Sequence, residues 1–139
     1  MSGYAGDITP QEAWNILESR KDAVLIDVRT RPEWAFVGVP DLSDLSKQPK
    51  LISWQVYPDM DINGRFVEEV CALGVSPDTP ILFLCRSGGR SRSAAIAMTG
   101  QGYNACYNIA GGFEGDPDQV RHRGCVNGWK ASDLPWVQG

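Results

Sequence analysis

The sequence lacks the features that mark several classes of protein. It has one histidine, and its four cysteines form no C-x-x-C pair, so the common zinc-binding patterns are missing. No apolar run approaches the roughly 18 residues that a membrane-spanning helix needs. The first residues carry neither a basic nor an apolar segment, so we expect no signal peptide. We therefore predict a cytoplasmic protein with reduced cysteines, without a metal and without a membrane partner.

Length and composition fit one globular domain. The 139 residues are 42% hydrophobic and 22% charged, which is ordinary for a soluble chain that buries a core without disulfides. A net charge of -4 disfavours a general nucleic-acid surface. No repeat, low-complexity tract or linker divides the chain. We expect one domain over residues 1–139, and a monomer, because a small domain with one self-contained site needs no partner chain.

Helical and strand patterns alternate along the chain. Thr9 and Glu12 form a capping box for a first helix. The predicted helices cover residues 10–18, 31–36 (a short helix or turn), 66–73 and 92–101. The predicted strands cover residues 23–26, 52–56, 80–84 and 105–109, with a long loop at 38–51. This alternation predicts an α/β fold with a small, mostly parallel sheet and helices on both faces. Aromatic residues predict that the stretch 126–139 packs on the domain.

The most informative segment follows the strand predicted at 80–84. Its seven consecutive residues are Cys85, Arg86, Ser87, Gly88, Gly89, Arg90 and Ser91. A free thiol is mostly protonated at neutral pH, whereas the thiolate is the reactive form. Consecutive backbone amides, the N-terminus of the next helix and nearby arginines all favour a thiolate in this position. Glycines allow the backbone angles that aim several amides at one centre.

Two side chains of this segment have more than one expected role. Ser91 can donate a hydrogen bond to the sulfur or cap the following helix, and Ser87 offers a second hydroxyl. Arg90 can form a fork around a bound oxyanion or bond to the carbonyls of the loop. The sequence alone leaves these alternatives open.

The four cysteines are not equivalent. A buried cysteine after a strand is usually a small core residue, but the glycine pair and three nearby arginines favour a functional thiol at Cys85. Cys71, on an apolar helix face, and Cys106, in a strand, are predicted to be core residues. Cys125 is predicted to lie on the surface. We expect the single histidine, His122, on the surface as well, so we assign no Cys–His pair.

Three segments occur in a fixed order along the chain. They are Asp27-Val28-Arg29 with Glu33-Trp34 and Gly38, the Cys85 segment, and Gly111-Gly112-Phe113. Together they resemble the signatures of the rhodanese family of sulfurtransferases, over a core of about residues 8–137. The resemblance implies a three-layer rhodanese-like fold.

The resemblance also gives roles to the first signature. It implies that Asp27 and Arg29 organise the surroundings of the site, although a simple salt bridge at the strand end is an equal alternative. The family usually has a histidine after the glycine that matches Gly38, and Val39 stands there in this chain. This departure changes our expectation for the packing of the local loop but not for activity.

The resemblance implies a two-step covalent sulfur transfer. Cys85 takes the outer sulfur of a donor such as thiosulfate and holds it as a persulfide, and cyanide or a thiol then removes it. Arg86 is expected to attract the anionic donor and Arg90 to shape the loop, without a metal or organic cofactor. The segment from Cys85 to Arg90 has six residues, one fewer than the Cys-x5-Arg loop of phosphatases on this fold. The shorter loop favours sulfur over phosphate.

Two other functions stay open at this point. A phosphatase or arsenate reductase would use the same fold, and the short loop disfavours it. A sulfur-relay or regulatory module would act on a protein partner, and every residue of the Cys85 segment is compatible with such a role.

Overall fold

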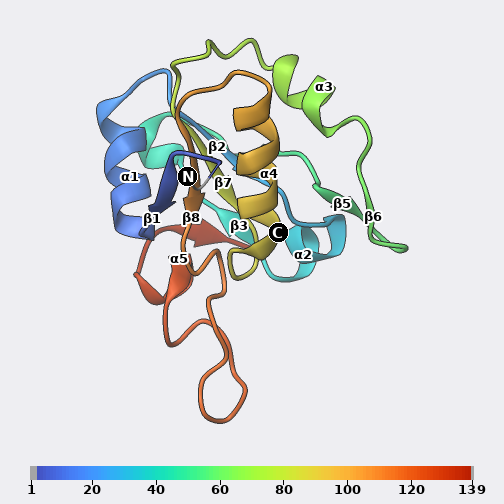
Figure 1. Ribbon diagram of the computed structural model, residues 1–139. Helices are drawn as coiled ribbons and strands as arrows, with labels where there is room; N and C mark the ends of the chain where they lie inside the picture. Colours follow the sequence, from blue (N-terminus) through green and yellow to red (C-terminus); the bar gives the residue numbers. More distant parts are fainter. Residues whose placement is uncertain (1–2, 139) are drawn as a thin grey trace.

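A five-stranded parallel sheet forms the centre of the protein (Figure 1). The computed structural model describes residues 3–138. The strands lie in the order β1-β8-β7-β2-β4, and each neighbouring pair is parallel. Their bounds are β1 Gly6–Ile8, β2 Val24–Asp27, β4 Lys50–Leu51, β7 Ile81–Leu84 and β8 Cys106–Ile109. The predicted parallel α/β fold is confirmed, and β1 is an edge strand that the sequence did not indicate.

Within residues 3–138, five α-helices connect and cover the strands. Their bounds are α1 Pro10–Ser19, α2 Arg31–Phe36, α3 Phe66–Cys71, α4 Gly89–Gly100 and α5 Gly128–Ala131. The capping box of α1 is present, since the Thr9 hydroxyl accepts from the Glu12 amide and the Glu12 carboxylate accepts from the Thr9 amide. The helix predicted at 92–101 starts earlier, at Gly89, because the glycine segment continues directly into the first helical turn. No helix within residues 3–138 is long and apolar enough to cross a membrane.

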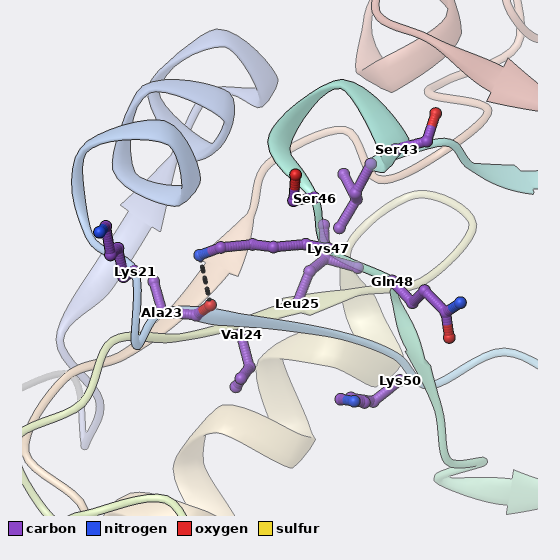
Figure 2. A pocket seen from close by; sticks show the side chains of 10 residues that line it. Lys21, Ala23, Val24, Leu25, Ser43, Ser46, Lys47, Gln48 and Lys50 are labelled. Carbon is purple, nitrogen blue, oxygen red and sulfur yellow. Dashed lines mark hydrogen bonds between the residues drawn. The ribbon is translucent and has the colours of Figure 1, made fainter.

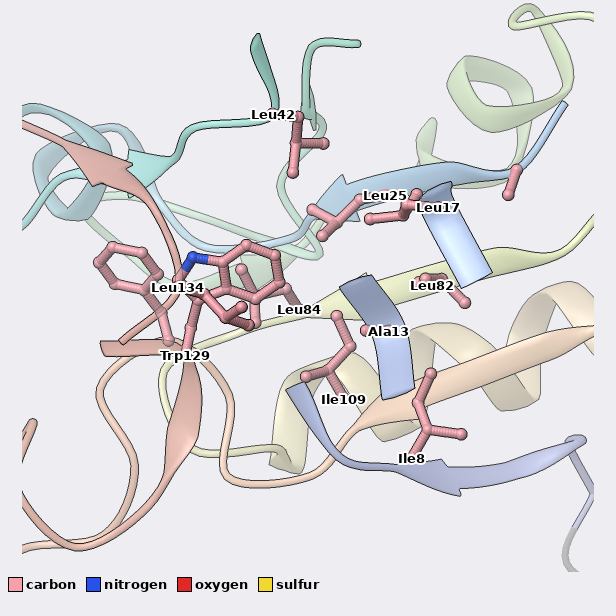
Figure 3. Close-up of a cluster of buried hydrophobic side chains, with 12 residues drawn as sticks. Ile8, Ala13, Leu17, Leu25, Leu42, Leu82, Leu84, Ile109, Trp129 and Leu134 are labelled. Carbon is pink, nitrogen blue, oxygen red and sulfur yellow. The ribbon is translucent and has the colours of Figure 1, made fainter. Parts of the chain in front are cut away.

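Alternating side chains of the strands build one apolar cluster on each face of the sheet. One cluster joins the strands to α1 and α5, and Figure 3 shows Ala13, Leu17 and Trp129 of these helices around Leu82 and Leu84. The other cluster joins the strands to α3 and α4 through residues such as Ile81, Phe83, Phe66, Ala94 and Met98. The period of two along β7 therefore separates the two faces. The expected three-layer arrangement is confirmed.

The region after β2 differs most from the prediction. The loop expected at 38–51 contains β3 Val39–Pro40, the short 3-10 helix η1 Ser43–Leu45 and β4. The strand expected at 52–56 was wrong. The chain leaves the sheet after the amide of Trp54 bonds to the Val28 carbonyl, at 3.0 Å. It then enters a separate antiparallel hairpin of β5 Gln55–Val56 and β6 Asp61–Ile62.

Two further expectations concern α3 and the C-terminal stretch. The prediction for Cys71 was wrong, because Phe66 and Val70 occupy the buried face of this short helix and Cys71, one residue further round, is exposed.

The expected packing of 126–138 is confirmed; residue 139 lies outside the described residues. Trp129 is fully buried, and β9 Trp136–Val137 pairs with β3, so Val39 faces Val137 in an antiparallel bridge.

Candidate active site

Cys85 lies directly after β7, the middle strand of the sheet. In open α/β sheets, ligands bind at the carboxyl ends of the strands, and Cys85 is at that end. Its side chain belongs to the cluster on the α4 face and is only 1% exposed. The position alone would suit a core residue, so the polar contacts of the sulfur decide its character.

Two donors reach the sulfur of Cys85. The amide of Gly88 lies 3.0 Å from Sγ and the hydroxyl of Ser91 lies 3.2 Å from it. Gly88 is the N-cap of α4 with φ 118°, a backbone angle that disfavours any residue with a Cβ. Of the two roles expected for Ser91, donation to the sulfur is confirmed and capping of the helix was wrong, because Gly88 is the N-cap.

The first turn of α4 lies next to the sulfur of Cys85. Among residues 3–138, one amide bonds to the sulfur rather than the several that we expected, because Gly89 and Arg90 are already helical. A helix leaves its first amides without partners inside the helix, so those of Gly89 and Arg90 remain able to bind an anion. The helix has 12 residues and directs its positive end to Cys85.

Arg90 forms an ion pair with Glu33 of α2. Its two terminal nitrogens lie 2.7 Å and 2.9 Å from the two carboxylate oxygens. The expected bonds from Arg90 to loop carbonyls were wrong, since this carboxylate offers stronger acceptors in fork geometry. Burial raises the pKa of Glu33, but hydrogen bonds and charge from Arg90 outweigh it, so the pKa lies below its usual value. The pair joins the start of α4 to α2.

An open pocket of about 510 Å³ lies beside this ion pair and the Cys85 segment. Its lining residues are Glu33, Val37, Gln55, Met60, Arg86, Arg90 and Glu114. Arg86 is exposed, which suits the expected contact with a donor from solvent. Ser87 is half-buried between Arg86 and Gly88, and its hydroxyl bonds to no residue of the described part of the chain.

The turn after β8 is hydrogen-bonded to the backbone of the Cys85 segment. The Phe113 amide donates to the Cys85 carbonyl at 2.8 Å, and the Glu114 amide donates to the Arg86 carbonyl at 3.0 Å. Gly112 has φ 62°, and a Cβ there would lie 2.4 Å from the Cys85 carbonyl oxygen. The Gly-Gly-Phe segment thus allows two loops to pack backbone against backbone.

Asp27 and Arg29 form a fully buried ion pair at the end of β2. Arg29 Nη2 lies 2.6 Å from the Asp27 carboxylate and 2.7 Å from the Gly38 carbonyl. The guanidinium also lies 4.3 Å from the ring centroid of Phe113. The salt-bridge alternative is confirmed. Through Phe113, the pair also contacts the turn that is hydrogen-bonded to the Cys85 segment.

Two residues that the sequence analysis missed extend the polar contacts of Ser91. Its hydroxyl lies 2.5 Å from Asn108 Oδ1, and Asn108 Nδ2 donates to Asp7 Oδ1 at 2.9 Å. Asn108 has a polar side chain, yet it is buried in β8. A lone amide inside an apolar strand was the available signal, because a buried polar group needs partners.

Within residues 3–138, the other thiols and the histidine form no hydrogen bond with Cys85, Ser91 or Arg90. Cys106 is buried, as predicted, and Cys125 and His122 are exposed, as predicted. No group of three or more histidine, cysteine or acidic side chains within residues 3–138 is arranged to hold a metal ion.

A second cavity, of about 580 Å³, lies at the opposite, amino end of β2 (Figure 2). Figure 2 shows Lys21, Lys47 and Lys50 around it. The ammonium of Lys47 already donates to the carbonyls of Arg20 and Ala23, at 2.7 Å and 2.8 Å. This lysine secures the end of α1 and is not part of the Cys85 site.

A family model described as the STR4 middle domain matches residues 5–139. The chain belongs to the STR4 middle-domain family. An uncharacterized protein of Rickettsia rickettsii, the RP600 homolog, is 39% identical over 132 residues, or 94% of this chain and 95% of the relative. A protein named thiosulfate sulfurtransferase GlpE, from Actinobacillus pleuropneumoniae serotype 5b (strain L20), is 27% identical over 135 residues, or 97% and 95% of the two chains.

Comparison with solved structures shows similarity in fold. The crystal structure of Rv0390 from M. tuberculosis has a TM-score of 0.88 and 47% identity, covering 98% of this chain and 99% of that one. A rhodanese-like domain protein from Staphylococcus aureus has a TM-score of 0.53 and 23% identity, covering 77% and 86% of the two chains. The rhodanese-like fold is confirmed for this member of the STR4 middle-domain family.

Proposed function

We propose that this protein transfers a sulfane sulfur from a small anionic donor to a nucleophilic acceptor through a persulfide on Cys85. The observation that carries the proposal is the pair of donors on one buried sulfur, the Gly88 amide and the Ser91 hydroxyl. Hydrogen bonds to a charged atom stabilise it more than bonds to a neutral one, so these donors match the negative charge that the sulfur carries in the proposed reaction. The name of the Actinobacillus relative suggests thiosulfate as the first donor to try.

Each step of the proposed reaction conserves atoms and charge. The Cys85 thiolate attacks the outer sulfur of thiosulfate, a new S–S bond forms, the original S–S bond breaks, and sulfite leaves with its electron pair. The persulfide then carries one negative charge on its outer sulfur. Cyanide or a thiolate attacks that outer sulfur, becoming thiocyanate or a new persulfide, and Cys85 leaves as the thiolate.

Surrounding residues take positioning and electrostatic roles in this reaction. Exposed Arg86 attracts the donor dianion into the pocket, because no carboxylate within residues 3–138 pairs with it, whereas Glu33 pairs with Arg90. The unpaired amides at the start of α4 bind the outer sulfur of the persulfide. Arg90 and Glu33 fix the start of α4 relative to α2.

The proposal is tested with purified protein, thiosulfate and cyanide. The wild type is expected to form thiocyanate, and mass spectrometry after incubation with thiosulfate alone is expected to show about 32 Da on the Cys85 peptide, one added sulfur. Cys85→Ser is expected to lose both. Thiocyanate formation that survives Cys85→Ser would overturn the role of Cys85. Turnover of an aryl phosphate or arsenate in place of thiosulfate would overturn the reaction class.

Exposed apolar side chains beside the pocket favour a polypeptide as acceptor. Met60 lines the pocket, and Ile62, 62% exposed, pairs across the hairpin with Gln55, another lining residue. Phe36, 77% exposed, precedes Val37 at the same rim. Apolar groups exposed around a site mark surfaces that bind other molecules.

The acceptor class is tested with the loaded protein. Two synthetic peptides serve as probes, one with a cysteine between leucines and one with a cysteine between serines. Ile62→Asp is expected to slow sulfur transfer to the leucine peptide while leaving transfer to cyanide unchanged. Equal rates for both peptides, with no effect of Ile62→Asp, would leave small thiols as the favoured acceptors.

A further inference from the structure

A line of hydrogen-bonded polar groups leads from the protein surface to Cys85. It begins at Asp7 of β1, passes through Asn108 of β8, and ends at Ser91 of α4. Strands β1 and β8 are neighbours in the sheet (Figure 1), and α4 packs against β8, so the three contributors lie in adjacent elements. Asn108 is 1% exposed and Ser91 is fully buried, so the bonds of Ser91 to Asn108 and to Cys85 are shielded from water, whereas Asp7 is exposed.

Asp7 sets the orientation of the Asn108 amide. The hydrogen bond from Asn108 lowers the pKa of Asp7, burial opposes this, and bonds from Tyr4 and the charge of Arg92 lower it further. The ionised carboxylate only accepts hydrogen bonds, so it requires the NH2 group of Asn108 at its side. The amide oxygen is thereby directed to Ser91, where it lies 2.5 Å from the hydroxyl.

The Ser91 hydroxyl has one proton and two acceptors within reach. Asn108 Oδ1 lies 2.5 Å from it and Cys85 Sγ lies 3.2 Å from it. When the sulfur is anionic, it is the stronger acceptor. When the inner sulfur is neutral, as in the thiol or the persulfide, the amide oxygen is stronger. A serine without such a partner turns its hydroxyl to the carbonyl one helical turn earlier.

We propose that Asn108, oriented by Asp7, is a positioning residue that holds the Ser91 hydroxyl beside Cys85 and accepts its hydrogen bond whenever the sulfur is neutral. The hydroxyl then needs only a rotation of its O–H bond, without a change of rotamer, to serve the thiolate. The inference rests on the proposed function, because the alternation between anionic and neutral sulfur is that of the sulfur-transfer cycle.

The test measures the reactivity of Cys85 in a way that does not require sulfur transfer. In a Cys71→Ser/Cys125→Ser background, which removes the exposed thiols, iodoacetamide labelling of the Cys85 peptide is followed by mass spectrometry. Ser91→Ala and Asn108→Leu are each expected to slow labelling about tenfold, the size expected for a hydrogen bond to a charged sulfur. The double variant is expected to be no slower than Ser91→Ala, because Asn108 acts through Ser91.

Two matched controls separate positioning from a general effect on folding. Asn104, two residues before β8, also donates to an aspartate, Asp78, at 2.9 Å, and Asn104→Leu is expected to label at the wild-type rate. Asp7→Asn keeps an acceptor for Asn108 and is expected to stay near wild type, whereas Asp7→Leu is expected to slow labelling about threefold.

The outcomes distinguish this inference from the proposed function. Slowing by Asn108→Leu that multiplies with that of Ser91→Ala would overturn the positioning role, and so would a wild-type rate for Asn108→Leu. Absence of thiocyanate formation by the wild type would overturn sulfur transfer without affecting the labelling result. If both hold, Asn108→Leu is expected to lower kcat for thiosulfate and leave KM unchanged, because Arg86 is untouched.

Discussion

Two buried cysteines lie at opposite ends of the same helix, α4. Cys85 follows the last residue of β7, and Cys106 is the first residue of β8, next to the first residue of β7. Both are at most 1% exposed and both belong to the apolar cluster beneath α4. Cys85 receives hydrogen bonds from the Gly88 amide and the Ser91 hydroxyl. The Cys106 thiol donates to the Tyr103 carbonyl at 3.9 Å, and burial raises its pKa.

The contrast teaches that burial does not decide what a cysteine does. Parallel strands bring the N-terminus of the following helix to their carboxyl ends, together with its free amides and partial positive charge. The C-terminal end of the same helix presents carbonyls and partial negative charge. Direction along the sheet therefore separates a thiol suited to carry charge from a thiol suited to stay neutral.

The largest expected effect tests this contrast directly. Incubation with thiosulfate is expected to add sulfur to Cys85 and none to Cys106, because burial raises the pKa of the Cys106 thiol more than the hydrogen bond from Thr99 lowers it. Correspondingly, Cys85→Ser is expected to abolish thiocyanate formation and Cys106→Ser to retain it. Peptide mass spectrometry and the thiocyanate assay are the measurements. Loss of activity in folded Cys106→Ser would break the comparison.

The next effect tests how far the carboxyl end depends on its buried ion pair. Asp27→Ala leaves the guanidinium of Arg29 buried without its counter-charge and is expected to lower the free energy of unfolding by about 3–5 kcal/mol. Urea denaturation measures the change. Asp22→Ala, which removes an exposed pair with Arg20, is the control and is expected to unfold near the wild-type midpoint. Equal midpoints for both variants would contradict the prediction.

One substitution made at both ends of α4 sharpens the comparison. Gly88→Ala strains a residue with φ 118° and is expected to slow sulfur loading of Cys85 about tenfold, since misplacing the amide removes a bond to the charged sulfur. Gly100→Ala, at the last residue of the helix, has open space for a Cβ and is expected to load normally. The measurement is the rate at which thiosulfate loads sulfur on Cys85 in each variant, followed by mass spectrometry. Similar rates for the two variants would remove the special role of Gly88.

The smallest effect is the pH dependence that Glu33 contributes through Arg90. The folded pKa of Glu33 lies below the usual value of 4.5, so the stabilisation from its ion pair is present above that pH and is lost as pH falls through the folded pKa. Glu33→Gln is expected to be less stable than wild type at pH 7 by about 1 kcal/mol, because the pair is only partly buried. Urea titrations at pH 7 and pH 3 measure the gap. A gap of equal size at both values would contradict the prediction.

Local sequence patterns predicted the elements around the site well. The capping box of Thr9 and Glu12, the apolar run before Asp27 and the strand before Cys85 depend on neighbouring residues, and each occurs where expected. The expectation failed at residues 52–56, where alternation suggested one strand. Alternating residues satisfy both an edge strand and a hairpin, and the pairing partner decides between them.

The candidate site was predicted only in part for the same reason. The sulfur, the glycines and Ser91 lie within seven residues and could be assigned together. The partner of Arg90 could not, because Glu33 is 57 positions away in the chain. Asn108 and Asp7 were missed because 101 positions separate them, and only the pairing of β1 with β8 brings them together.

The sequence by itself determined that a cysteine follows a buried strand and opens a glycine-rich turn into a helix. Turn and helix-start chemistry is local, so a few adjacent residues specify it. Only the tertiary structure decided which donors reach Sγ, which carboxylate holds Arg90, and that Asn108 stands behind Ser91. These contacts depend on strand order and on helix placement over the sheet, which result from burial of apolar faces summed over the whole chain.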